Sequence, residues 1–175
     1  VRRPDAVSSS SIEAGVLAST DGWLAPRLSA DLARQDGNGS LELVEFLCTA
    51  LLKPGDVVFT ENPSYDRAIT LFRRHGLTVI GVPLEADGPN IDALEKLLTQ
   101  HKPKLFYVIP DFQNPSGATC SGAKRRAIAE IAKKHELLLL EDAPYRMLRY
   151  RGAQEPTLFS LVPERTLHMT SFTKL

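Results

Sequence analysis

The sequence has few of the features that mark secreted, metal-binding or membrane proteins. It holds only two cysteines among 175 residues, Cys48 and Cys120, and their spacing fits neither a metal site nor a disulfide framework. The first residues contain no apolar leader core, and no apolar run approaches the length of a membrane span. We therefore expect a protein of a reducing, cytoplasmic compartment, without a metal ion or a membrane as partner.

An excess of charge of either sign is also absent. The chain has 21 basic and 21 acidic residues, so its formal net charge is zero. Proteins that bind nucleic acids or anionic membranes neutralise phosphates with surplus Lys and Arg, and no surplus exists here. Nucleic acid is therefore not an expected partner, and the length fits one domain with a sizeable core.

Patterning is weak in residues 1–37 and strong from residue 38 onward. The N-terminal segment predicts only a short helix over 29–35 and stays unassigned. Beyond it, apolar runs that predict strands alternate with helical periodicity, which is typical of a mostly parallel sheet with helices on both faces. We predict a three-layer α/β fold with helices at 41–53, 66–75, 91–101 and 121–135, and strands at 57–61, 78–82, 105–109, 137–140 and 166–170.

The run of leucines at 137–140 predicts a strand that is buried on both faces. It ends on Glu141 and Asp142, and Pro144 prevents the strand from continuing. Asp142 therefore lies at the carboxyl end of a buried strand, where ligands bind in open α/β sheets. The alternative is that Asp142 only starts the turn before Pro144.

Other polar residues also follow predicted strands and belong to the same edge. Tyr65, Asn114 and Lys174 come after three further strands. Gly39 and Ser40 precede an apolar helix, where free N–H groups and the helix dipole favour a phosphate. An ordinary capped helix with Ser40 as N-cap explains that turn equally well.

A lysine beside hydroxyl groups, a buried carboxylate, a tyrosine and an Asn-Pro loop together indicate a Schiff-base site. Lys174 can condense with an aldehyde, and pyridoxal 5'-phosphate offers an aldehyde, a ring nitrogen, a phenolic oxygen and a phosphate. A carboxylate such as Asp142 keeps a ring nitrogen protonated. Hydroxyl and amide groups suit the phenolic oxygen, Ser171 and the turn at Ser40 suit the phosphate, and the Tyr65 ring suits stacking.

These motifs resemble the class I/II aminotransferases of the pyridoxal-phosphate fold type I family. The clearest likeness is to the group with 2-aminoadipate and kynurenine aminotransferases and the aminotransferase-like domains of some bacterial regulators. The resemblance covers residues 38–175, with the motifs in family order. They are Asn38-Gly39-Ser40, Lys53-Pro54-Gly55-Asp56, Glu61-Asn62-Pro63-Ser64-Tyr65, Gln113-Asn114-Pro115-Ser116-Gly117, Glu141-Asp142-Ala143-Pro144-Tyr145 and Ser171-Phe172-Thr173-Lys174.

The resemblance implies a role for each matching residue. Lys174 would be the Schiff-base lysine and proton shuttle, and Asp142 would face the ring nitrogen. The reaction would move an amino group from an amino acid to a 2-oxo acid, in a homodimer. The remaining implied contacts are Asn114 and Tyr145 at the phenolic oxygen, Gly39, Ser40, the Leu41 backbone and Ser171 at the phosphate, and Tyr65 on the ring.

The family pattern continues beyond Lys174, with a phosphate-binding Arg, a smaller C-terminal domain and an Arg for the substrate carboxylate. None of these follows in this sequence, so we expect the core of the cofactor-binding domain of a longer enzyme, inactive or weakly active alone. Two alternatives stay open: a lyase similar to aminocyclopropane-carboxylate synthase, and a non-catalytic or regulatory cofactor-binding domain. Residues 1–37 show no winged-helix pattern, which argues against a regulator.

Overall fold

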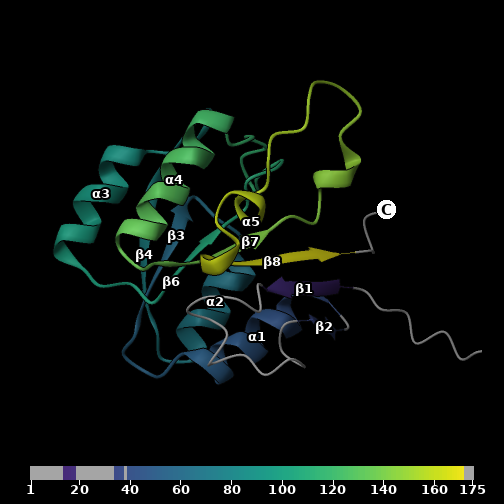
Figure 1. The fold of residues 1–175 in the computed structure, drawn as a ribbon. Coiled ribbons are helices and arrows are strands. Elements are labelled where there is room, and N and C mark those ends of the chain that lie inside the picture. The colour runs from purple at the N-terminus through teal and green to yellow at the C-terminus, as the bar shows by residue number, and fades with distance from the viewer. Residues whose placement is uncertain (1–13, 19–33, 38, 172–175) are drawn as a thin grey trace, which may run out of the picture.

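The computed structural model describes residues 39–171 with their side chains and the backbone of residues 14–18 and 34–37 (Figure 1). Lys174 lies outside the described residues. In chain order the elements are β1 (Ala14–Ala18), β2 (Arg34–Gly37), α1 (Ser40–Leu51), β3 (Val57–Asn62), α2 (Asp66–Arg74), β4 (Thr78–Glu85), β5 (Gly88–Pro89), α3 (Ile91–Gln100), β6 (Leu105–Val108), α4 (Gly122–Lys134), β7 (Leu138–Asp142), the 3-10 helix η1 (Arg146–Leu148), α5 (Leu158–Leu161), the 3-10 helix η2 (Pro163–Arg165) and β8 (Thr166–Ser171).

The strands form one mixed sheet in the order β2-β1-β8-β7-β6-β3-β4-β5. Its centre is parallel, because β3 pairs with β4 and β6, and β7 pairs with β6 and β8 in that sense. Antiparallel pairs lie only toward the two ends, where β1 joins β8 and β2, and β5 joins β4. The carboxyl ends of β3, β6, β7 and β8 therefore meet at one edge, as the alternation of strands and helices predicts.

Helices cover both faces of the sheet and divide the core in two (Figure 1). On one face, α1 and α2 pack on the side chains of Val58, Tyr107 and Leu140. On the other, α3, α4 and α5 pack on those of Phe59, Phe106 and Leu139. Neighbouring strand residues thus point to opposite cores, which explains why these strands read as unbroken apolar runs.

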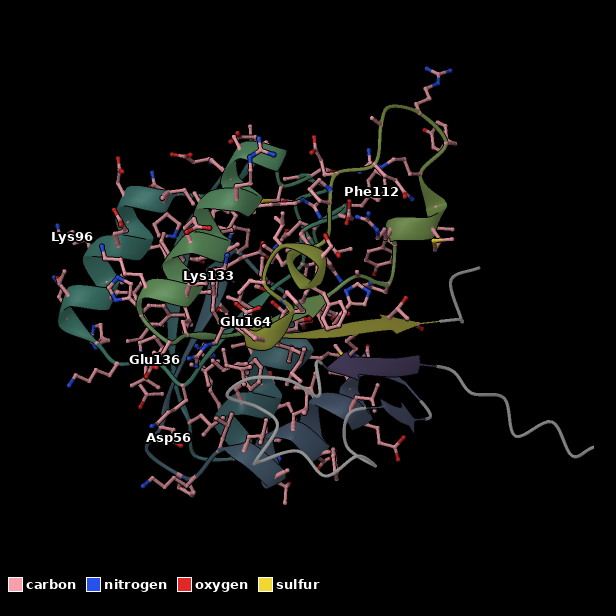
Figure 2. The ribbon with its side chains drawn as sticks, in the orientation of Figure 1. Asp56, Lys96, Phe112, Lys133, Glu136 and Glu164 are labelled. Carbon is pink, nitrogen blue, oxygen red and sulfur yellow. The ribbon has the colours of Figure 1, made fainter. Side chains whose placement is uncertain are left out.

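The charged faces of the helices point away from the sheet. Lys96 on α3 extends outward from the molecule, as Figure 2 shows, and Lys133 on α4 is exposed. No helix in the described part of the chain is long and apolar enough to cross a membrane.

The strands and helices predicted from residue 38 onward are confirmed, with ends that differ by a few residues. The helix predicted over 29–35 is wrong where it can be compared, since residues 34–35 belong to the strand β2 and residues 29–33 lie outside the described residues. The sequence of β2, Arg34-Gln35-Asp36-Gly37, has no strand pattern. Its conformation follows from backbone pairing with β1, which in turn pairs with β8.

Glu141 and Asp142, at the end of β7, point to opposite faces of the sheet. The Glu141 carboxylate accepts hydrogen bonds from the backbone N–H groups of Leu158 and Phe159 at 2.8 and 3.1 Å and lies 2.8 Å from Nδ1 of His168. It therefore holds the start of α5. Asp142 belongs to the face that α1 and α2 cover, and it is the carboxylate that is available to a ligand.

Candidate active site

A cavity of about 330 Å³ lies at the carboxyl edge of the parallel strands. Its size is within the range of ligand pockets in proteins, which begins at about 300 Å³. The wall combines the start of α1 with the loops after β3, β6 and β7 and the end of β8. The lining residues are Gly39, Ser40, Leu41, Glu42, Tyr65, Ile109, Asn114, Asp142, Pro144, Tyr145 and Ser171.

The structure brings together eight of the nine residues predicted to bind a cofactor. They come from five separate segments and all line this one cavity. The ninth, Lys174, lies three positions after the end of β8, outside the described residues. The eight in the cavity wall are Gly39, Ser40, Leu41, Tyr65, Asn114, Asp142, Tyr145 and Ser171.

Asp142 is buried, and only one of its two carboxylate oxygens has a hydrogen-bond partner among the described residues. Its Oδ2 accepts a hydrogen bond from the Tyr107 hydroxyl at 2.6 Å. Its Oδ1 has no hydrogen-bond partner in the described part of the chain. Two other buried side-chain atoms there lack a partner, Ser64 Oγ and Arg149 Nε, but neither residue lines the cavity. The cavity wall thus contains a buried carboxylate oxygen that needs a donor.

Burial raises the pKa of Asp142 from 3.8 to about 6, although the hydrogen bond from Tyr107 and the nearby His168 oppose this rise. The cause is desolvation, which disfavours the charged carboxylate. A cationic donor at Oδ1 would offset that cost and return the pKa toward its usual range. The site is therefore suited to a ligand with a protonated nitrogen.

The N-terminus of α1 also lines the cavity. Gly39 is the N-cap instead of the predicted Ser40, and no side chain caps the helix there. Gly39 has φ of 148°, which L side chains rarely adopt, so the backbone itself requires glycine at this turn. The first N–H groups of a helix that starts without a side-chain cap can donate to an anion.

Gln113 ties together the loops that carry Tyr65 and Asn114. Its Nε2 donates to Glu61 Oε2 at 3.0 Å and to the carbonyl oxygen of Pro63 at 2.9 Å. Burial raises the pKa of Glu61 to about 8, against the hydrogen bonds from Gln113 and the Ile109 N–H, and the charge of Asp142 adds to the rise. Glu61 therefore holds its proton to higher pH than an exposed glutamate does.

Sequence reasoning missed Tyr107, and it assigned no role to Glu61 and Gln113 although both stand in the motifs. A signal for Tyr107 was present, because a tyrosine hydroxyl in the middle of a strand buried on both faces must find a partner. Which partner it finds depends on how β6 and β7 are paired, and that pairing is a tertiary property.

Comparisons with known proteins agree with this geometry. The sequence model of the family "Aminotransferase class I and II" matches residues 29–174. The 2-aminoadipate transaminase of Thermus thermophilus is 34% identical over 141 residues, which are 78% of this chain and 36% of that protein. The aromatic-amino-acid aminotransferase 1 of Thermococcus litoralis is 29% identical over 162 residues, which are 87% of this chain and 39% of that protein.

Among solved structures, the kynurenine aminotransferase of Pyrococcus horikoshii superposes with a TM-score of 0.76 at 32% identity and covers 87% of this chain and 40% of its own. The mixed, mostly parallel sheet of this chain, with helices on both faces, matches the α/β domain of fold type I aminotransferases. The chain spans about 36–39% of the length of the curated relatives named above. With a family match over most of its residues and the fold of that family, the chain belongs to the class I and II aminotransferases.

Proposed function

We propose that the protein carrying this chain moves an amino group from an amino acid to a 2-oxo acid, with pyridoxal 5'-phosphate as cofactor. The observation that carries the proposal is the buried Oδ1 of Asp142, which has no partner among the described residues and belongs to a residue that lines the cavity. A protonated ring nitrogen is the kind of donor that this oxygen lacks. The family and the names of its relatives favour amino-group transfer over the lyase alternative.

The other residues of the cavity fit the same cofactor. The start of α1 at Gly39 and Ser40 suits the phosphate, and Ser171 adds a hydroxyl. Asn114 and Tyr145 offer an amide and a hydroxyl to the phenolic oxygen, and the Tyr65 ring offers a flat surface for stacking. A related structure, the α-aminoadipate aminotransferase of Thermus thermophilus, holds N-(5'-phosphopyridoxyl)-L-leucine, which supports this choice of cofactor.

When bound, the cofactor supplies an electron-withdrawing ring that stabilises negative charge at the substrate α-carbon. Asp142 would hold the proton on the ring nitrogen, and Tyr107 fixes the orientation of the carboxylate. Asn114 and Tyr145 would orient the phenolic oxygen. In this proposal the Nζ atom of Lys174 would bind the cofactor aldehyde and would move the proton at the substrate α-carbon.

Borohydride reduction of the cofactor-loaded protein, followed by peptide mass mapping, tests the assignment. We expect a pyridoxyl group on Lys174 and no label in Lys174→Arg. Label on Lys104 or Lys124 instead would contradict the proposed site. A second assay, with glutamate and a panel of 2-oxo acids, should show formation of 2-oxoglutarate that depends on the added cofactor.

The same proposal assigns residues 38–175 to the cofactor-binding domain and includes a homodimer in the cytoplasm. Both cysteines are buried and free, which supports a reducing compartment. Size-exclusion chromatography with light scattering tests the homodimer. A fully active monomer would contradict the proposed homodimer.

A further inference from the structure

We propose that Asp111 and the three arginines around it position Asn114 and Tyr145 at the phenolic oxygen of the cofactor. This inference rests on the proposed function. The Asp111 cluster consists of Asp111, Arg125, Arg146 and Arg149. None of them lines the cavity, so they act through the two residues that do.

Asp111 is fully buried and receives hydrogen bonds from all three guanidinium groups. Arg125 donates to Oδ1 at 2.9 Å and to Oδ2 at 3.3 Å. Arg146 donates to Oδ2 at 3.0 Å, and Arg149 to Oδ1 at 3.1 Å. Burial alone would raise the pKa of Asp111, but the hydrogen bonds and charges of Arg125 and Arg146 outweigh it and hold the pKa below its usual range.

The cluster connects the two loops that carry the phenolic-oxygen ligands Asn114 and Tyr145. Asp111 lies three residues before Asn114, and Arg146 directly follows Tyr145. Arg125 anchors the Asp111 loop to α4, because its guanidinium also donates to the carbonyl oxygens of Pro110 at 2.8 Å and Cys120 at 2.9 Å. The loop of Tyr145 joins this anchor through the contact of Arg146 with Asp111. A shift of either loop would therefore break charged hydrogen bonds in the buried cluster.

The charges in the cluster do not balance, which argues against a purely stabilising role. One carboxylate faces three cations, and the remaining partners are backbone carbonyls, such as Glu155 O for Arg146 at 2.6 Å. The guanidinium carbon of Arg149 lies 4.8 Å from the centroid of the Phe112 ring, and its Nε has no described partner. Arg146 and Arg149 keep 16% and 12% of their side-chain surface exposed, and apolar residues of similar volume in place of such desolvated ion pairs are often at least as stable.

The geometry of the guanidinium group explains what this arrangement achieves. A planar fork that binds a carboxylate fixes direction as well as distance, unlike a lysine ammonium. Displacement of a positioning group by about 1 Å can reduce function a hundredfold, so loops that carry ligands need such anchors. The Asp111 cluster sets the separation of Asn114 and Tyr145 before the cofactor arrives.

The test compares the binding of pyridoxal 5'-phosphate with that of 3-deoxypyridoxal 5'-phosphate, which lacks the phenolic oxygen. Calorimetric titration of the unmodified full-length protein should show a preference for the natural cofactor, and Asn114→Ala should reduce it. Arg146→Met and Arg149→Met should each reduce the same preference roughly ten- to a hundredfold, the value of a charge-assisted hydrogen bond. Binding of the deoxy analogue should stay within about twofold.

Arg151→Met is the matched control, because it removes the same charge from an exposed position in the same segment. Arg151→Met should leave the preference for the natural cofactor unchanged. Arg149→Lys should show a preference between those of Arg149→Met and the unmodified protein. Equal loss of affinity for both compounds in Arg146→Met and Arg149→Met would show a merely structural cluster and overturn the inference. An unmodified protein that binds neither compound would instead contradict the proposed function itself.

Discussion

The hydroxyl of Tyr107 donates to Asp142 Oδ2 over 2.6 Å, between two neighbouring parallel strands. The register of β6 and β7 places Tyr107 beside Leu140, two residues before Asp142 and on the same face of the sheet. This contact satisfies one oxygen of the carboxylate and fixes its rotation. The other oxygen, Oδ1, has no described partner, and Asp142 lines the cavity.

Asp142→Asn should separate stability from function. Because the folded protein raises the pKa of Asp142 from 3.8 to about 6, the stability that this group contributes is present below pH 3.8 and lost as pH rises through about 6. Removal of the charge should therefore increase the unfolding free energy of the cofactor-free protein near pH 7.5, by at most about 3 kcal/mol. Cofactor affinity and turnover should fall. Urea denaturation and cofactor titration measure the two effects, and lower stability with unchanged affinity would make Asp142 a turn residue.

Tyr107→Phe keeps the ring, which packs edge-on against Phe72 with centroids 5.8 Å apart, and removes only the hydroxyl. Asp142 Oδ2 then loses its donor, so the pKa of Asp142 should rise further. We expect a loss of about 1–3 kcal/mol of unfolding free energy at pH 8, where the carboxylate is charged. The loss should be smaller at pH 5, and an equal loss at both pH values would show that the hydroxyl serves packing alone.

Glu61→Gln should flatten the pH dependence of stability in the cofactor-free protein. The pKa of Glu61 is raised from 4.5 to about 8, mainly by burial, so its stabilising contribution is complete below pH 4.5 and is lost as pH rises through 8. Between pH 5 and pH 8.5, a range that follows from these pKa values, the melting temperature of the variant should decline less than that of the unmodified protein. Glu95→Gln removes a charge from an exposed position and should keep the full decline. A variant as pH-dependent as the unmodified protein would contradict this assignment.

Gly39→Ala should weaken the phosphate end of the cavity. Nothing lies within 4 Å of an added Cβ, so the effect would come only from the backbone at φ of 148°. Backbone strain of this kind costs on the order of 1–3 kcal/mol. We expect lower stability of the α1 start and lower affinity for pyridoxal 5'-phosphate, with a smaller loss for pyridoxal, which has no phosphate. Equal losses for both compounds would show that Gly39 does not act on the phosphate.

The alternation of strands and helices after residue 38 could be predicted because each element is apolar where it meets a layer of the core. The run at 137–140 and the carboxylate after it are local facts, and β7 follows them with every residue buried. The short strands toward the ends of the sheet were not predicted, because β2 and β5 have no strand pattern and the apolar run of β1 has only five residues. Backbone pairing decides them: β1 pairs with the distant β8, β2 with β1, and β5 with the preceding β4.

The sequence by itself determined which residues are present at the sheet edge, because the carboxyl ends of parallel strands must meet there. Only the tertiary structure decided which of them share one cavity and which polar groups stay unsatisfied. Tyr107 meets Asp142 because β6 and β7 pair in one register, and Asp111 meets three arginines because α4 and η1 approach the same loop. A hydrogen bond requires a distance near 3 Å, and a sequence pattern fixes the face of an element but not that distance.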